Sequence, residues 1–149
     1  MAPKYFEDFT LGQCYTTTRR TITETDIVNF ACLTGDFHPL HMDQLYAETT
    51  PYKTRIAHGP LIFALAVGLI SQTGLFADSF VLFVGASDLR FPLPVRAGDT
   101  LMVEAQVTES RASSKPDKGV LKMHYAVKNQ NAEETMSVDM SCLVPRRPS

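Results

Sequence analysis

This sequence has few cysteines and no large excess of positive or negative charge. Each of these features excludes some classes of protein. The 149 residues include only three cysteines, Cys14, Cys32 and Cys142, which lie far apart. They fit neither a disulfide framework nor the close spacing of a zinc site, and this favours a reducing compartment. The 14 basic and 16 acidic residues give a net charge of −2. Because nucleic-acid-binding proteins carry basic patches, we expect no nucleic-acid partner.

Long apolar runs are also missing. The longest, residues 61–70, has half of the roughly 20 residues that a helix needs to cross a bilayer. The first residues carry charges and lack the apolar stretch of a signal peptide. A chain of 149 residues is long enough to bury a core of its own. We therefore expect a cytoplasmic protein with no membrane span and a single domain, residues 1–149.

Two helices are predicted from their end signals. Residues 21–35 have a capping-box-like pair, Thr23 and Asp26, near the start, and Gly35 at the end. A second helix, residues 60–74, begins with proline, which suits the first position because no backbone N–H is needed there. Its residues are apolar on all sides, so we expect it to be buried on every side. A short helical turn is predicted over residues 43–50.

The second half of the chain alternates apolar and polar residues with a period of two. This pattern predicts half-buried strands over residues 99–110, 118–129 and 134–144. Residues 79–91 begin with a continuous apolar run, which predicts a strand buried on both faces. Residues 12–23 are also β-prone. Consecutive strands and one apolar helix indicate an α+β fold, in which an antiparallel sheet wraps around the helix.

The segment TGDFHPLHMD, residues 34–43, gathers two aspartates and two of the four histidines. Gly35 and Pro39 predict a stiff loop here rather than a helix. Such a loop can aim a carboxylate, Asp36, and an imidazole, His41, at one point, and this pair suits general acid–base catalysis near neutral pH. A lone aspartate or histidine would more simply be a turn cap or a surface residue, but the grouping favours catalysis.

The same segment allows a second interpretation, a metal site. Asp36, His38, His41 and Asp43 offer oxygen and nitrogen ligands. Zinc-binding histidine pairs are typical of helices and zinc fingers, whereas this pair encloses a proline, and no cysteine or further histidine lies close in the sequence. We therefore favour catalysis without a metal, and metal binding stays the minor alternative.

The stretch RIAHGPL, residues 55–61, places His58 and Gly59 at the start of the apolar helix. The first N–H groups of a helix have no acceptor within it, and the helix dipole favours negative charge there. Gly59 has no side chain that would keep a ligand away, so its N–H could bind a carbonyl oxygen that becomes an enolate. A plain helix cap explains Gly59 and Pro60 equally well. The pairing with the acid–base segment favours function.

Three stretches together resemble a known family. GDFHPLHMD, residues 35–43, resembles the G-D-x-N-P-x-H-x-D motif of the MaoC-like, or R-specific, enoyl-CoA hydratases. RIAHG, residues 55–59, and PLPVRAGDTL, residues 92–101, resemble two further signatures of that family, and the opening FEDFTLGQCY also matches. The resemblance covers nearly the whole chain. It implies a hotdog fold, in which a curled antiparallel sheet surrounds a long central helix, and a homodimer.

The resemblance also implies a reaction. Asp36 and His41 would be the catalytic pair, holding one water and adding it across the double bond of a trans-2-enoyl-CoA to give an (R)-3-hydroxyacyl-CoA. Gly59 would bind the thioester carbonyl. CoA would be part of the substrate, with no separate cofactor. An acyl-CoA thioesterase and a non-catalytic acyl-binding module stay open as alternatives.

One residue departs from the family motif, which usually has asparagine where this chain has His38. The family asparagine helps to hold the water and the loop, so we expect His38 to influence substrate choice without being an essential acid or base. The expected substrate-binding residues are His38, Arg55, His58, Gly59 and Arg96. Candidates for the CoA phosphates are Lys53, Arg55, Arg90 and Arg96.

Overall fold

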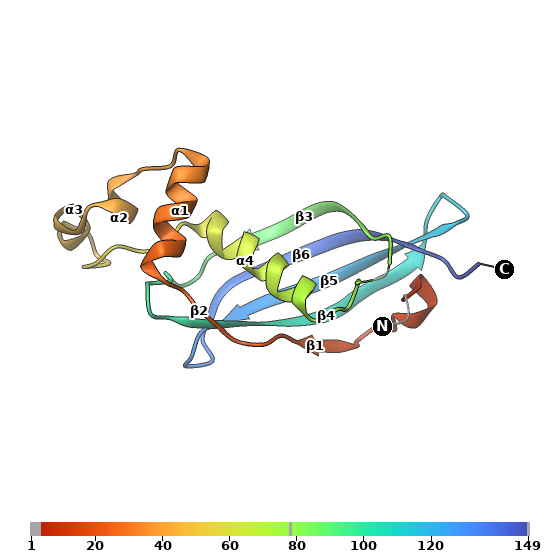
Figure 1. The fold of residues 1–149 in the computed structure, drawn as a ribbon. Helices are drawn as coiled ribbons and strands as arrows, with labels where there is room; N and C mark the ends of the chain where they lie inside the picture. Colours follow the sequence, from red (N-terminus) through yellow and green to blue (C-terminus); the bar gives the residue numbers. More distant parts are fainter. Residues whose placement is uncertain (1–3, 78, 149) are drawn as a thin grey trace.

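The computed structural model describes residues 4–77 and 79–148. One long helix, α4, lies along a curled antiparallel sheet, and three shorter helices gather at one end of the molecule (Figure 1). This confirms the predicted α+β class with a sheet around one central helix. In chain order the elements are η1 (Phe6–Asp8), β1 (Cys14–Thr16), β2 (Arg20–Thr21), α1 (Glu24–Thr34), α2 (Pro39–Met42), α3 (Gln44–Thr49), α4 (Gly59–Gln72), β3 (Leu82–Arg90), β4 (Thr100–Ala112), β5 (Lys118–Lys128) and β6 (Glu134–Pro145).

Strands β4, β5 and β6 form the centre of the sheet. The strand order is β1-β4-β5-β6-β3, with β2 also paired to β4, and neighbouring strands are antiparallel. The predicted alternation is confirmed, because every second residue of β4 and β5 is buried over most of their length. These side chains form one core with the buried residues of α4. Burial of one face therefore fixes the register of the central strands.

The prediction that α4 is buried on every side is wrong for this chain. Ala64 and Val67 are exposed, although both are apolar. They line an apolar cavity of about 600 Å³ between α4 and β3. The sheet covers only part of the helix surface, and the side of α4 next to this cavity stays open. The buried residues of α4 are Leu61, Ile62, Ala66, Leu69 and Ile70.

Strand β3 also differs from its prediction. The apolar run in residues 79–91 predicts burial on both faces, but β3 is the outermost strand of the sheet and most of its residues are exposed. Phe83 is 55% exposed and Val84 is 54% exposed. The pairing of β3 with β6 is irregular between Ser87 and Arg90. The sequence pattern identified the strand correctly, but an apolar run does not reveal what covers it.

Helices α1, α2 and α3 form what we call the helical segment, residues 24–49. α1 has its predicted ends, since Thr23 and Asp26 form a capping box and Gly35 adopts a left-handed φ of 78°. α2 corrects the prediction of a continuous loop: Pro39 occupies the start of a single helical turn, and His41 lies on that turn. Within residues 4–77 and 79–148, no helix is long and apolar enough to cross a membrane.

Candidate active site

Asp36 lies on the short loop that leaves α1. Its Oδ1 accepts a hydrogen bond from the backbone N–H of His38 at 3.3 Å, which makes a tight local turn. Its own N–H donates to Oγ1 of Thr34 at 3.3 Å. The Asp36 side chain remains 50% exposed. Local bonds therefore orient the carboxylate while leaving it open to a ligand or water.

His41 is held by the backbone on the other side of the site. Its Nδ1 lies 2.7 Å from the carbonyl oxygen of Ile56. Because a carbonyl oxygen only accepts hydrogen bonds, Nδ1 carries the hydrogen and Nε2 carries the lone pair. Pro39 restricts the residue before it, and His38 has φ −56° and ψ 135°. The imidazole of His41 thus keeps a free acceptor nitrogen.

His58 lies behind these two residues. It precedes α4 and is only 1% exposed. Its Nε2 lies 2.9 Å from the main-chain oxygen of Asp36. Its ring stacks on the ring of His41, with centroids 3.8 Å apart and an interplanar angle of 29°. His58 therefore contacts both residues of the predicted catalytic pair.

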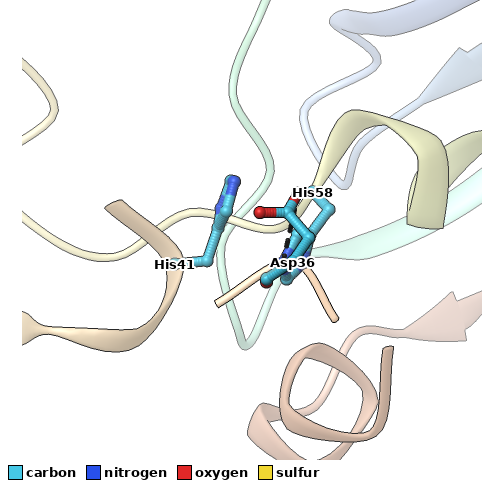
Figure 2. Close-up of side chains that lie close together, drawn as sticks. All are labelled: Asp36, His41 and His58. Carbon is cyan, nitrogen blue, oxygen red and sulfur yellow. Dashed lines mark hydrogen bonds and ion pairs between the residues drawn. The ribbon is translucent and has the colours of Figure 1, made fainter. Parts of the chain in front are cut away.

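Asp36, His41 and His58 lie close together (Figure 2). One carboxylate oxygen and one nitrogen from each ring all lie within 4.8 Å of one another. A water that bonds to two groups at once separates them by about 4.5 Å, given two bonds of about 2.8 Å at a tetrahedral angle. The 4.8 Å limit therefore leaves the Asp36 carboxylate and the His41 imidazole close enough to share one water.

The environment of His41 lowers its pKa. Desolvation by burial is the main cause, because it penalises the charged ring. Charge on His58 and His38 would lower this pKa further, while the Ile56 carbonyl and the Asp36 carboxylate oppose the shift. A lowered pKa keeps His41 unprotonated near pH 7, so the ring can accept a proton there.

Gly59 faces the same site from the start of α4. It lines a hollow of about 270 Å³ together with His41, Tyr52 and Phe91, which we call the catalytic hollow. As the first residue of α4, Gly59 has an N–H without an acceptor inside the helix. A Cβ at this position would lie only 3.0 Å from the ring of Phe91. Any larger residue here would have to push the Phe91 ring aside by a few tenths of an ångström, whereas glycine leaves its N–H available to an oxygen atom.

Comparison with known proteins places this geometry in a family. A family model described as a MaoC-like domain matches residues 8–129. The chain belongs to the MaoC-like dehydratase family. A solved structure of a monoamine oxidase regulatory protein from Archaeoglobus fulgius superposes with a TM-score of 0.91 and 37% identity, covering 98% of this chain and 97% of that one. The α+β architecture is thus the hotdog fold of the MaoC-like proteins.

Two curated relatives share the MaoC-like domain. An (R)-specific enoyl-CoA hydratase from Rhodospirillum rubrum is 41% identical over 104 residues, which cover 70% of this chain and 69% of that protein. Protein MaoC from Klebsiella aerogenes is 42% identical over 100 residues, or 67% of this chain. This chain spans only 29% of the length of protein MaoC. That larger protein therefore contains sequence with no counterpart in the match.

The basic residues predicted to bind substrate each contact another residue of this chain. Arg55 forms an ion pair of 2.5 Å with Glu24 of α1. Arg96 donates to the main-chain oxygen of Tyr52, a residue of the catalytic hollow, at 3.3 Å. The other two phosphate candidates are Lys53, whose Nζ donates to the main-chain oxygen of Glu48, and Arg90, which lies 3.9 Å from Asp88.

The metal interpretation does not fit this arrangement. The side chain of Asp43 caps α3, and Nδ1 of His38 accepts a backbone hydrogen bond. A metal bound by imidazole lies near the plane of the ring, but His41 and His58 stack face to face at 3.8 Å. With a tilt of only 29°, the two ring planes meet well beyond the rings, too far for one ion to bond a nitrogen of each. The donor atoms of the MaoC-like site are thus arranged for hydrogen bonding.

Sequence reasoning missed two features of this MaoC-like site. It placed His58 at the start of a helix and assigned it to substrate binding, but the ring is buried between Phe30 and His41. It did not single out Phe91, whose ring closes over Gly59. The available signals in the sequence were a histidine before Gly-Pro and an aromatic residue before a proline-rich turn. Neither signal shows where the side chain points.

Proposed function

We propose that this chain adds water reversibly across the double bond of a trans-2-enoyl-CoA and forms an (R)-3-hydroxyacyl-CoA. The observation that carries this proposal is the approach of the Asp36 carboxylate and the His41 imidazole to within 4.8 Å, beside the start of α4. Family membership supports the same reaction, because one relative is named an (R)-specific enoyl-CoA hydratase.

The reaction needs only groups that this chain supplies. The oxygen of the bound water forms a bond to C3, and one of its protons passes to the Asp36–His41 pair. The C2–C3 π electrons move toward the thioester carbonyl, whose oxygen gains negative charge beside the N–H of Gly59. A proton from the pair then adds to C2. The pair ends in its starting protonation state, so the net change is the addition of one water.

The apolar cavity between α4 and β3 suits the acyl chain. Its volume is about 600 Å³, and Phe63, Val67, Phe83, Tyr125 and Met140 are among its lining residues. The catalytic hollow likewise lies between α4 and the residues that follow β3. Sites for apolar ligands typically have this size and character. Lys53, Arg55, Arg90 and Arg96 remain our candidates for the CoA phosphates.

We also propose that two copies of the chain pair through β3. This strand has a free edge, and large apolar side chains are exposed on it and beside it. They are Phe80, Leu82, Phe83, Val84, Leu89, Phe91 and Leu93. A second copy would pair the edge and cover these side chains, as homodimers commonly do. Light scattering at micromolar concentration should give the mass of a dimer, and a monomer mass would contradict the pairing.

A panel of trans-2-enoyl-CoA substrates tests the activity. The conjugated double bond absorbs in the ultraviolet, so hydration is followed as a loss of absorbance. The product is then oxidised by a dehydrogenase specific for (R)-3-hydroxyacyl-CoA. We expect loss of absorbance for at least one chain length, together with a product of R configuration.

The same panel distinguishes the other two functions. A thioesterase would release free CoA thiol, which a thiol reagent detects, without requiring the double bond. A non-catalytic module would bind acyl-CoA, measured by calorimetry, and leave every substrate unchanged. Either result would contradict the hydratase proposal.

A further inference from the structure

His58 occupies the N-cap position of α4, but its side chain forms no capping hydrogen bond. It is the residue before α4, and its ring forms no hydrogen bond to the first turn of α4 in the part of the chain that the structure describes. Serine, threonine, aspartate and asparagine are the residues that cap helices with their side chains. An imidazole that is 1% exposed at this position therefore has contacts of another kind.

The first contact fixes the main chain of Asp36. Nε2 of His58 lies 2.9 Å from the Asp36 carbonyl oxygen, so Nε2 must carry the hydrogen and donate it. The same nitrogen lies 4.0 Å from Oδ2 of the Asp36 carboxylate. Nδ1 of His58 is buried and has no hydrogen-bond partner among residues 4–77 and 79–148. One N–H thus serves the catalytic loop, and the ring offers no second donor.

The second contact fixes the ring of His41. The faces of the two imidazoles stack at 3.8 Å, and Phe30 of α1 lies behind His58 with its centroid at 5.1 Å. The edge of the His41 ring is bonded to the carbonyl of Ile56 at 2.7 Å. The face of His41 is thus held by His58 and its edge by the backbone, which leaves Nε2 without a partner in these contacts.

We propose that His58 is a positioning residue that couples Asp36 to His41. It bonds the main chain of one and stacks on the ring of the other, so a single buried side chain sets the distance between the carboxylate and the imidazole. This inference rests on the proposed hydratase function for its kinetic consequence. Its structural consequence, the orientation of His41, does not depend on any activity.

The two contacts can be removed separately. His58→Phe keeps a flat ring against His41 but has no N–H for the Asp36 carbonyl. His58→Gln keeps an N–H donor but has no flat ring. A displacement of about 1 Å can cost roughly 100-fold in rate, so we expect kcat to fall 10- to 100-fold in each variant, with KM changed less than threefold. His124→Gln is the matched control, because it removes a histidine on the sheet, 2.7 Å from Asp139.

The titration of His41, followed by NMR at its Cε1–H without substrate, supplies a readout that a purely structural role would not move. Burial is what lowers the pKa of this group, and the groups that face it are Asp36, His38, His58 and the Ile56 carbonyl. His58→Gln should admit water and raise the pKa of His41 toward its ordinary value. His58→Phe should leave it lowered, because the ring remains.

The outcomes separate the two proposals. Full kcat per folded molecule in both variants, with a lower melting temperature and an unmoved His41 titration, would overturn the positioning role. If the wild-type chain hydrates no enoyl-CoA, the hydratase proposal fails, and the His41 titration in His58→Gln still decides the inference. A raised pKa supports it, and an unchanged pKa overturns it.

Discussion

Two aspartate–histidine pairs, one on the sheet and one in the helical segment, are built differently. On the sheet, His124 of β5 and Asp139 of β6 are cross-strand neighbours bonded directly at 2.7 Å. In and beside the helical segment, Asp36 and His41 approach within 4.8 Å without a hydrogen bond to each other. A direct bond satisfies both partners, whereas a separated pair keeps its acid–base capacity for a third molecule. We therefore expect acid–base activity at the separated pair and not at the bonded one.

The two regions also differ in what holds them. The central strands are fixed by burial of alternate residues in one core. The helical segment buries only Ile27, Ala31 and Ala47, and local hydrogen bonds set its shape, such as the Thr23–Asp26 capping box. It lies beyond the end of the sheet in Figure 1. Stability should therefore depend mainly on the sheet, and catalysis on the segment.

The largest expected effect on activity is at the Asp36–His41 pair. Asp36→Asn and His41→Ala should each reduce kcat/KM by about 10²–10⁴, the usual loss when a general acid or base is removed. Melting temperatures should stay within a few degrees, because Asp36 is exposed and His41 half-buried. Steady-state kinetics beside thermal melts measure both quantities.

The sheet pair is the control for that experiment. Asp139→Asn and His124→Ala change the same residue types at a pair with 36% and 43% exposed side chains. We expect turnover within about twofold of wild type, since surface changes usually alter stability by less than 0.5 kcal/mol. Near-normal turnover in Asp36→Asn, or a large loss in Asp139→Asn, would reverse the assignment of the two pairs.

The difference between the regions also explains what the sequence could predict. Thr23, Asp26 and Gly35 act within one helix, so their local pattern predicted both ends of α1 correctly. The alternation of apolar and polar residues predicted the buried face of β4, β5 and β6, because successive side chains of a strand point to opposite faces. Asp36 and His41 stood out because they lie only five positions apart in one segment, with a proline between them that limits the backbone.

Features that depend on distant partners were not predictable in the same way. The apolar run of β3 identified a strand but not its place at the edge of the sheet. The sequence of α4 is apolar on all sides, so it did not show which side the sheet leaves uncovered. The ring of His58 packs between α1 and α2, and its partner Asp36 lies 22 residues away in the sequence. Such contacts follow from the tertiary arrangement, which a pattern of neighbours does not contain.

The second prediction tests the sheet. Leu121 lies in β5 with 0% exposure and pairs with Cys142 of β6. Leu121→Ala should lower the free energy of unfolding by about 2–5 kcal/mol, because it removes buried methyl groups and leaves a cavity. The folded molecules should retain kcat within about twofold. Denaturant unfolding and kinetics at low temperature check this, and a selective loss of kcat would show that the core and the site are coupled.

The third prediction concerns Gly59, where the sheet-bound helix meets the catalytic hollow. In Gly59→Ala the new Cβ would lie 3.0 Å from the Phe91 ring, which must move by a few tenths of an ångström. Phe91 lines the hollow, so we expect kcat/KM to fall roughly tenfold, about 1.4 kcal/mol. The free energy of unfolding should change by less than about 1 kcal/mol, because alanine favours the helix while the close contact opposes it.

Gly68→Ala in the same helix is the matched control for this change. A Cβ there meets nothing within 4 Å. The variant should stabilise the chain by about 0.5–1 kcal/mol, the helix preference of alanine over glycine, and leave kcat unchanged. Equal activity of the two variants would show that the space around Gly59 has no catalytic importance.

The smallest expected effect is at His38, the residue that departs from the family motif. Its Nδ1 accepts a hydrogen bond of 3.2 Å from the backbone N–H of Leu40, so the ring caps α2. An asparagine side chain can accept the same bond, and this geometry favours a loop-holding role over contact with the acyl group. His38→Asn should therefore keep kcat within about threefold and the free energy of unfolding within about 0.5 kcal/mol, since asparagine is among the best capping residues.

His38→Ala removes that cap and should cost about 1 kcal/mol of stability, with a loss of activity larger than in His38→Asn. The comparison is made on a straight-chain and a carboxylated enoyl-CoA. A capping role changes both substrates equally, because α2 positions His41 for either one. A preference shifted by tenfold or more in His38→Asn would instead mean that the imidazole contacts the substrate. In that case the capping bond to Leu40 would be incidental, and the substrate-selecting role expected from the sequence would be supported.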